Sequence, residues 1–106
     1  MALTKEYKAT VVARIKRDPA FARALYAGAL DAILTGETAE GLSMLRDLIH
    51  AEISFKELAR QTGYNEKSLH RMLSGRGNPT ARTLAKIVTA IQEDLGFVPH
   101  VKVATA

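Results

Sequence analysis

The chain has 106 residues, of which 47% are hydrophobic, and it carries a formal net charge of +4 and no cysteine. This length suits a single domain, residues 1–106, and the composition excludes a disordered chain, a disulfide framework and a thiolate metal site. No stretch approaches the ~20 apolar residues of a membrane span and no signal peptide is expected, so we predict a cytoplasmic protein that does not enter a membrane.

The first part of the chain, residues 1–50, is predicted to form three helices. The first covers residues 7–17 and ends at Asp18-Pro19, a pair that starts a new helix because aspartate caps it and proline fits its first position. The second helix covers residues 19–35, with Gly36 closing it, and the third covers residues 38–50.

Residues 54–73 predict a helix, a tight turn and a second, short helix. Ser54 is a good N-cap, and Glu57 three residues later completes the pattern of a capping box. Gly63 is expected to end the first helix in the left-handed conformation, and Asn65 to cap the second. Two helices joined by so short a turn are typical of the DNA-binding helix-turn-helix.

The second of these helices has two chemically different faces. At about 100° per residue, one face is apolar and the other carries Lys67, His70, Arg71 and Ser74. A helix that lies in a DNA major groove needs this division, although an ordinary amphipathic helix with a solvated polar face shows it too. We predict Arg71 as a base reader because arginine paired with guanine is the commonest specific contact, with a phosphate contact as the alternative.

The segment that follows is expected to contact the DNA backbone. Arg76 and Asn78 lie in a glycine-rich loop and are predicted to contact phosphates, as is Lys67 near the start of the helix. Thr80 caps a final helix over residues 81–94, whose first amides could hold a phosphate; a plain structural cap is the alternative. Between Phe55 and Lys86 the chain carries +5, whereas the remainder carries −1. A polyanion is therefore the expected partner of this segment.

Residues 97–103 alternate like a short β-strand, with Pro99 restricting it to a sheet edge. A lone strand on an all-helical domain has no partner within its own chain, so we expect it to pair with the same strand of a second subunit. The residues predicted for this dimer contact are Phe97, Val98, Val101 and Val103. The alternative is a loosely ordered tail.

We predict neither enzymatic activity nor a cofactor or metal. The sequence shows no nucleophile accompanied by a base and an orienting group, and no phosphate-binding glycine loop. Glu66 and His70 are four residues apart on a helix, but two ligands do not make a zinc site. The other two histidines, His50 and His100, are expected to be isolated surface residues.

Over nearly its full length the chain resembles the addiction-module antidote family, the helix-turn-helix antitoxins of type II toxin–antitoxin pairs. The resemblance rests on the Asp18-Pro19 helix start, on Leu-Arg-Asp-Leu in the third helix, and on LARQTGYNEKSLHRMLSGRGNPT from Leu58 to Thr80. It extends through TLAKIVTAI to the closing Gly-Phe-Val-Pro.

This resemblance implies an all-α fold of five to six helices, with a Cro/cI-like helix-turn-helix core over residues 54–95. It also implies a homodimer that represses its own operon at a palindromic operator, and a small basic toxin of the RelE/ParE-like superfamily as partner. It places DNA contacts on the start and outer face of the second helix, where Glu66 would either read a cytosine amino group or complement the helix dipole. The full set of predicted DNA-binding residues is Asn65, Glu66, Lys67, Ser68, His70, Arg71, Ser74, Arg76, Asn78 and Thr80.

Residues 1–50 have no evident role in DNA binding and are the predicted toxin-contact region. A basic toxin would face the acids and aromatics of these helices: Glu6, Asp31, Glu37, Glu40, Asp47, Tyr7 and Tyr26. The alternative is that these helices only extend the core. At the level of function, the alternatives are a stand-alone repressor without a toxin, and a protein-interaction module that does not bind DNA.

Overall fold

The computed structural model describes the backbone of residues 5–106 and the side chains from Tyr7 onward. Within residues 5–106 it contains helices and no strand, which confirms the predicted all-α, helix-turn-helix class of fold. None of the helices in this range is long and apolar enough to cross a membrane. The helices are α1 (Lys5–Arg17), α2 (Pro19–Leu34), α3 (Thr38–Glu52), α4 (Phe55–Thr62), α5 (Glu66–Met72) and α6 (Ala81–Leu95).

The helix boundaries follow the capping residues. The Asp18 carboxylate accepts a hydrogen bond from the Phe21 amide at 3.1 Å, and Pro19 occupies the first position of α2 as predicted. Thr80 caps α6 by accepting from the Thr83 amide at 3.1 Å. These contacts satisfy amides that have no partner inside their own helix, which is why α2 and α6 start where they do.

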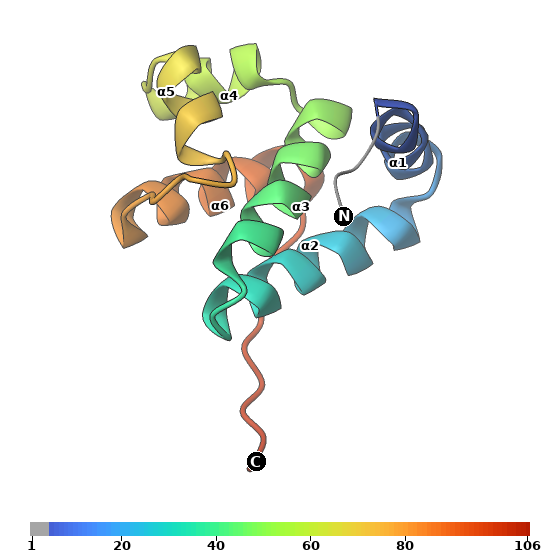
Figure 1. Ribbon diagram of the computed structural model, residues 1–106, viewed down its shortest axis with the longest axis vertical. Coiled ribbons are helices and arrows are strands. Elements are labelled where there is room, and N and C mark those ends of the chain that lie inside the picture. Colours follow the sequence, from blue (N-terminus) through green and yellow to red (C-terminus); the bar gives the residue numbers. More distant parts are fainter. Residues whose placement is uncertain (1–4) are drawn as a thin grey trace.

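The third helix lies at the centre of the fold, with α1 and α2 on one side and α4 to α6 on the other (Figure 1). Its buried side chains join those of the other five helices in one hydrophobic cluster. The largest fully buried side chains are Ile15, Leu42, Leu45, Leu48, Ile49, Leu58, Leu69, Leu73, Ile87 and Ile91. Because α3 contributes four of these ten, it is the element against which the helix-turn-helix is positioned.

The connection from α3 to α4 is tighter than predicted. The third helix continues to Glu52, so most of the expected link over residues 51–53 is helical. Ser54 then takes a positive φ of 89° with ψ of 148°, a conformation that costs roughly 1–3 kcal/mol for a residue other than glycine. Two hydrogen bonds hold it there: its amide donates to the Ile49 carbonyl at 2.7 Å, and its hydroxyl accepts from the Glu57 amide at 3.1 Å. The Glu57 carboxylate bonds to Arg60 and Gln61, so only half of the predicted capping box forms.

The predicted strand over residues 97–103 is wrong for this chain. Residues 97–106 form no helix or strand; the segment passes beside α2, and its C-terminal end extends beyond the helices (Figure 1). The physical reason is that a strand needs a second backbone to bond with, and residues 5–106 contain no other strand. Phe97 packs against the Tyr26 ring at a centroid distance of 6.1 Å, whereas Val98, Val101 and Val103 remain exposed.

Candidate nucleic-acid interface

The turn between α4 and α5 has the predicted geometry. Gly63 adopts φ of 79° and ψ of 3°, a left-handed conformation that ends α4, and its amide bonds to the Ala59 carbonyl. Asn65 caps α5, because its side-chain oxygen accepts from the amides of Lys67 at 2.8 Å and Ser68 at 3.4 Å. The two helices are thus separated by only three residues and are fixed at both sides of the turn.

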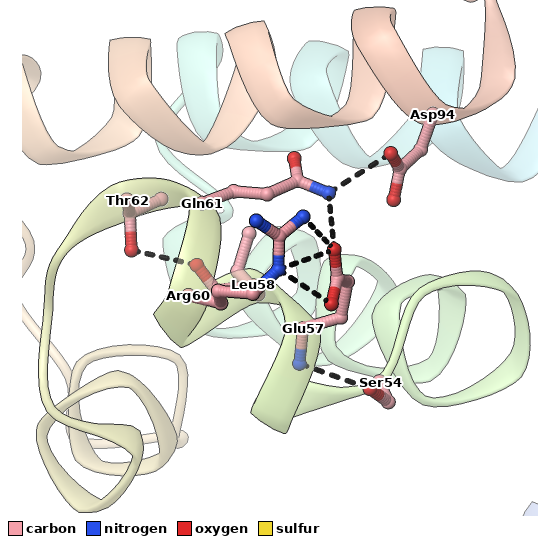
Figure 2. Close-up of polar contacts among 7 residues, drawn as sticks. All are labelled: Ser54, Glu57, Leu58, Arg60, Gln61, Thr62 and Asp94. Atoms are coloured by element: carbon pink, nitrogen blue, oxygen red, sulfur yellow. Dashed lines mark hydrogen bonds and ion pairs between the residues drawn. The ribbon is translucent and has the colours of Figure 1, made fainter.

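Polar contacts hold α4 against α6 (Figure 2). The Gln61 amide donates to Asp94 on α6 at 2.9 Å and to Glu57 at 3.3 Å. Glu57 also forms an ion pair with Arg60, and the hydrogen bond from Arg60 is the main cause that lowers the pKa of Glu57 to about 2. Nothing in the sequence indicates the Gln61–Asp94 contact, because its two residues lie 33 positions apart.

The turn itself is anchored on α6 through Tyr64. Its hydroxyl lies 3.2 Å from the Thr83 hydroxyl, and the Lys86 ammonium lies 5.1 Å from the centre of its ring. The second contact is a cation–π interaction, which places a positive charge beside the turn. Tyr64 therefore connects the turn to α6.

One face of α5 is buried in the core and the other is exposed. Leu69, in α5, and Leu73, which follows it, are fully buried, whereas Lys67 and Arg71 are exposed. None of the ion pairs formed by the described side chains, from Tyr7 onward, involves Lys67, Arg71 or Arg76. This face therefore presents cations that the protein does not neutralise, as a polyanion-binding surface requires.

The ten predicted DNA-binding residues lie on one continuous segment, from the cap of α5 to the cap of α6. Ser68 and Ser74 are half-buried, and the other eight are exposed. Some of the ten also have a structural role: Asn65 and Thr80 are helix caps, and the Ser74 hydroxyl donates to the Arg71 carbonyl at 2.8 Å.

The histidines form a ring cluster that the sequence does not indicate. The His70 ring stacks on Phe55 with centroids 3.9 Å apart and an angle of 16° between the planes. His50, expected to be isolated on the surface, lies 4.7 Å from Phe55 and 5.7 Å from His70, measured between ring centres. The described side chains contain no group of three or more histidine, cysteine, aspartate or glutamate residues that could hold a metal ion.

This ring cluster predicts a pH-dependent stability. Burial, followed by repulsion from His70, lowers the pKa of His50; Arg46 and Lys8 add to this, and Asp47 opposes it. A lowered pKa means that the unfolded chain binds protons more readily, so the contribution of His50 is lost as the pH falls below about 6.5. We expect the melting temperature to fall between pH 7 and pH 5, and to fall less in His50→Phe, which keeps a ring but cannot titrate. If the melting temperature fell equally with pH in the wild type and in His50→Phe, the pH dependence could not be assigned to His50.

A comparison with known families covers the same part of the chain. The model of the Cro/C1-type HTH DNA-binding domain matches residues 44–96, which is half of the sequence. The match runs from the middle of α3 to the residue that ends α6, and so includes every predicted DNA-binding residue. No curated protein and no solved structure matches the chain.

Proposed function

The chain belongs to the family of Cro/C1-type helix-turn-helix DNA-binding domains, and from its resemblance to the addiction-module antidote family we propose that it is the antitoxin of a type II toxin–antitoxin module. In this role it binds its own operator as a dimer in the cytoplasm, represses its operon and neutralises a small basic toxin. The observation that carries the DNA-binding part is the open face of α5, where Lys67 and Arg71 form no ion pair with the described side chains.

The proposed DNA complex places α5 in the major groove. Arg71 lies one turn after Lys67 on the exposed face, so both can reach the DNA while Leu69 stays in the core. Arg71 would pair with a guanine, and Lys67 near the helix start would contact a phosphate. Arg76 and Asn78, exposed in the loop after α5, would contact phosphates of the DNA backbone.

We assign the dimer contact to the exposed tail and the groove beside it. A groove of about 890 Å³ lies between α2, the end of α6 and residues 96–102. Three of the large exposed hydrophobic side chains line it, namely Leu34, Val98 and Val101, at 63–73% exposure. Exposed apolar side chains that line one groove mark an association site, and a second copy would supply an apolar surface that covers them. Two recognition helices would then face half-sites about 34 Å apart.

The tail contact is tested with Val101→Asp combined with Val103→Asp. Both side chains are exposed, so the variant keeps the core of one subunit intact but places charge in the proposed contact. We expect the variant to sediment as a monomer and the wild type as a dimer. The matched control, Ala104→Asp combined with Ala106→Asp, adds the same charge to the tail and should remain dimeric. A variant that stays dimeric would contradict the role of the valines.

Fewer residues than the sequence predicts are available to contact the toxin. Asp47 is only 8% exposed and forms an ion pair with Lys8 at 3.2 Å, and Tyr26 is only 3% exposed. Neither can face a partner, and the Glu6 side chain lies outside the described residues. The acids that remain exposed are Asp31, Glu37 and Glu40, near the turn that connects α2 and α3.

Glu37 and Glu40 do not line the groove assigned to the dimer contact, whereas Asp31 does, so these two acids give the negative surface that a basic toxin could bind. It lies at the end of α3 remote from α4 and α5 (Figure 1), so a toxin bound there leaves α5 free for DNA. Opposite charges at such a surface would steer association and mask the cations with which an RNA-cutting toxin holds its substrate.

Co-expression with the product of the neighbouring gene tests the toxin contact. We expect the wild-type chain to form a stable complex and to neutralise that product. The combined variant Glu37→Lys and Glu40→Lys should lose neutralisation but keep operator binding, whereas Arg71→Ala should show the reverse pattern. Charge reversal is preferable to deletion of α1 and α2, because deletion would remove buried side chains of both helices from the core. Undiminished neutralisation by the charge-reversed variant would contradict the assignment.

A stand-alone repressor is the second candidate, and the packing of α1 and α2 favours it. Ile15 and Ala29 are fully buried in the shared cluster, as expected of helices that serve to extend the core. Such a protein would bind its operator in the same way but would form no complex with the neighbouring gene product.

A further inference from the structure

The His70 ring is already engaged within the protein, although it lies on the side of α5 where the sequence predicts a DNA contact. It stacks almost parallel to Phe55, with 3.9 Å between ring centres. Phe55 is the first residue of α4 and is 3% exposed, so its ring belongs to the core cluster. His70 thus joins α5 to the start of α4 through an aromatic stack.

Two further groups surround the same ring. His50, in the last turn of α3, lies 5.7 Å from His70 between ring centres. The His70 Nε2 atom lies 4.0 Å from a carboxylate oxygen of Glu66, one turn earlier on α5. To read a base, an imidazole must direct a ring nitrogen at the base edge, and here one face and one nitrogen already have protein neighbours.

A second contact from α3 reaches the end of α5. The Arg46 guanidinium donates to the Leu73 carbonyl at 3.4 Å, although the two residues are 27 positions apart. This carbonyl is among those at a helix end that lack a partner inside the helix. Arg46 and His50 are one turn apart on α3, so one edge of α3 contacts α5 at two points.

We propose that His70 is a positioning residue, which fixes the orientation of α5 against α3 and α4, and that it does not read a base. This inference rests on the proposed DNA binding and refines it, because it assigns base reading to the Arg71 side of α5. Replacement of His70 would then change the affinity for all DNA sequences by the same factor and would leave the base preference unchanged.

The test compares the wild type with His70→Phe and His70→Ala in two measurements, the sequences selected from a random duplex library and the melting temperature. Phenylalanine keeps the stack on Phe55 but offers no nitrogen to a base. We therefore expect His70→Phe to select the wild-type sequence, to bind it within about threefold of the wild-type affinity, and to melt like the wild type. His70→Ala should bind all sequences about fivefold more weakly with unchanged preference, and should melt several degrees lower.

The matched control is Lys67→Ala, an exposed position on α5 that should leave the melting temperature unchanged. Loss of preference at one base pair in His70→Phe, with an unchanged melting temperature, would identify His70 as a base reader and overturn the inference. A wild-type melting temperature for His70→Ala would overturn it as well. If the wild type selected no sequence at all, the proposed function would fail, and the melting temperatures would still decide whether His70 holds α5.

Discussion

Replacing Gly77 with alanine should destabilise the protein by about 1–3 kcal/mol, because the new methyl group has no room. A Cβ atom at this position would lie 1.9 Å from the carbonyl oxygen of Met72, the last residue of α5. The obstacle is backbone and cannot rotate away, so either the loop or the end of α5 must move. Thermal unfolding measures the loss of stability, and the displaced loop should also weaken operator binding through Arg76 and Asn78.

Gly75 provides the matched control two residues earlier in the same loop. A Cβ atom there would meet no other atom within 4 Å, and the backbone does not adopt a positive φ. Gly75→Ala should therefore keep the wild-type stability or raise it by about 0.4–1 kcal/mol, since alanine restricts the unfolded chain. Equal melting temperatures for the two variants would contradict the close approach of Gly77 to Met72.

Replacing Arg71 with alanine should weaken binding to the operator by about 1–3 kcal/mol and should relax the preference at one base pair. The side chain is exposed on α5 and forms no ion pair with the described residues, so its loss should not change the melting temperature. Measurement of affinity for the operator and for single-base variants of it separates this role from a phosphate contact.

Lys67→Ala should give a different result from Arg71→Ala. A phosphate contact carries no sequence information, so all DNA sequences should bind more weakly and by a similar factor. The slope of log affinity against log salt concentration should decrease by about one. If both variants bound the operator with unchanged affinity and unchanged slope, α5 would not be the helix that enters the groove.

The parts of this fold that the sequence predicts are those determined over three or four residues. The cap of Asp18 on the Phe21 amide and the left-handed Gly63 are both local, so composition and spacing are enough to place the ends of α2 and α4. The same holds for the Asn65 cap of α5. Once the start of α5 is known, the helical period predicts which of its residues are exposed.

Contacts between distant parts of the chain could not be predicted in the same way. Asp47 is a charged residue of the kind that usually lies on the surface, yet it pairs with Lys8 from α1 and is nearly buried. His50 joins the ring cluster through residues that α4 and α5 bring to it. In both cases the decisive partner comes from another helix, and only the tertiary packing shows which one.

The C-terminal segment, residues 97–103, shows a second reason why a sequence pattern can fail to predict structure. Alternation of apolar residues indicates which side chains share a face of an extended segment, but strand formation also needs a bonding partner. Phe97 finds its partner in the ring of Tyr26 and packs on α2, while the valines after it remain exposed. The pattern thus predicts an extended segment and not its pairing.

The most direct test of sequence-specific regulation is a gel-shift titration with the DNA upstream of the gene, in the presence of excess non-specific DNA. We expect the wild-type protein to retard this fragment with a specific affinity that falls steeply with salt, and Arg71→Ala to lose most of that specificity. Binding that the competitor DNA abolishes completely, or no binding at all, would contradict a sequence-specific regulator.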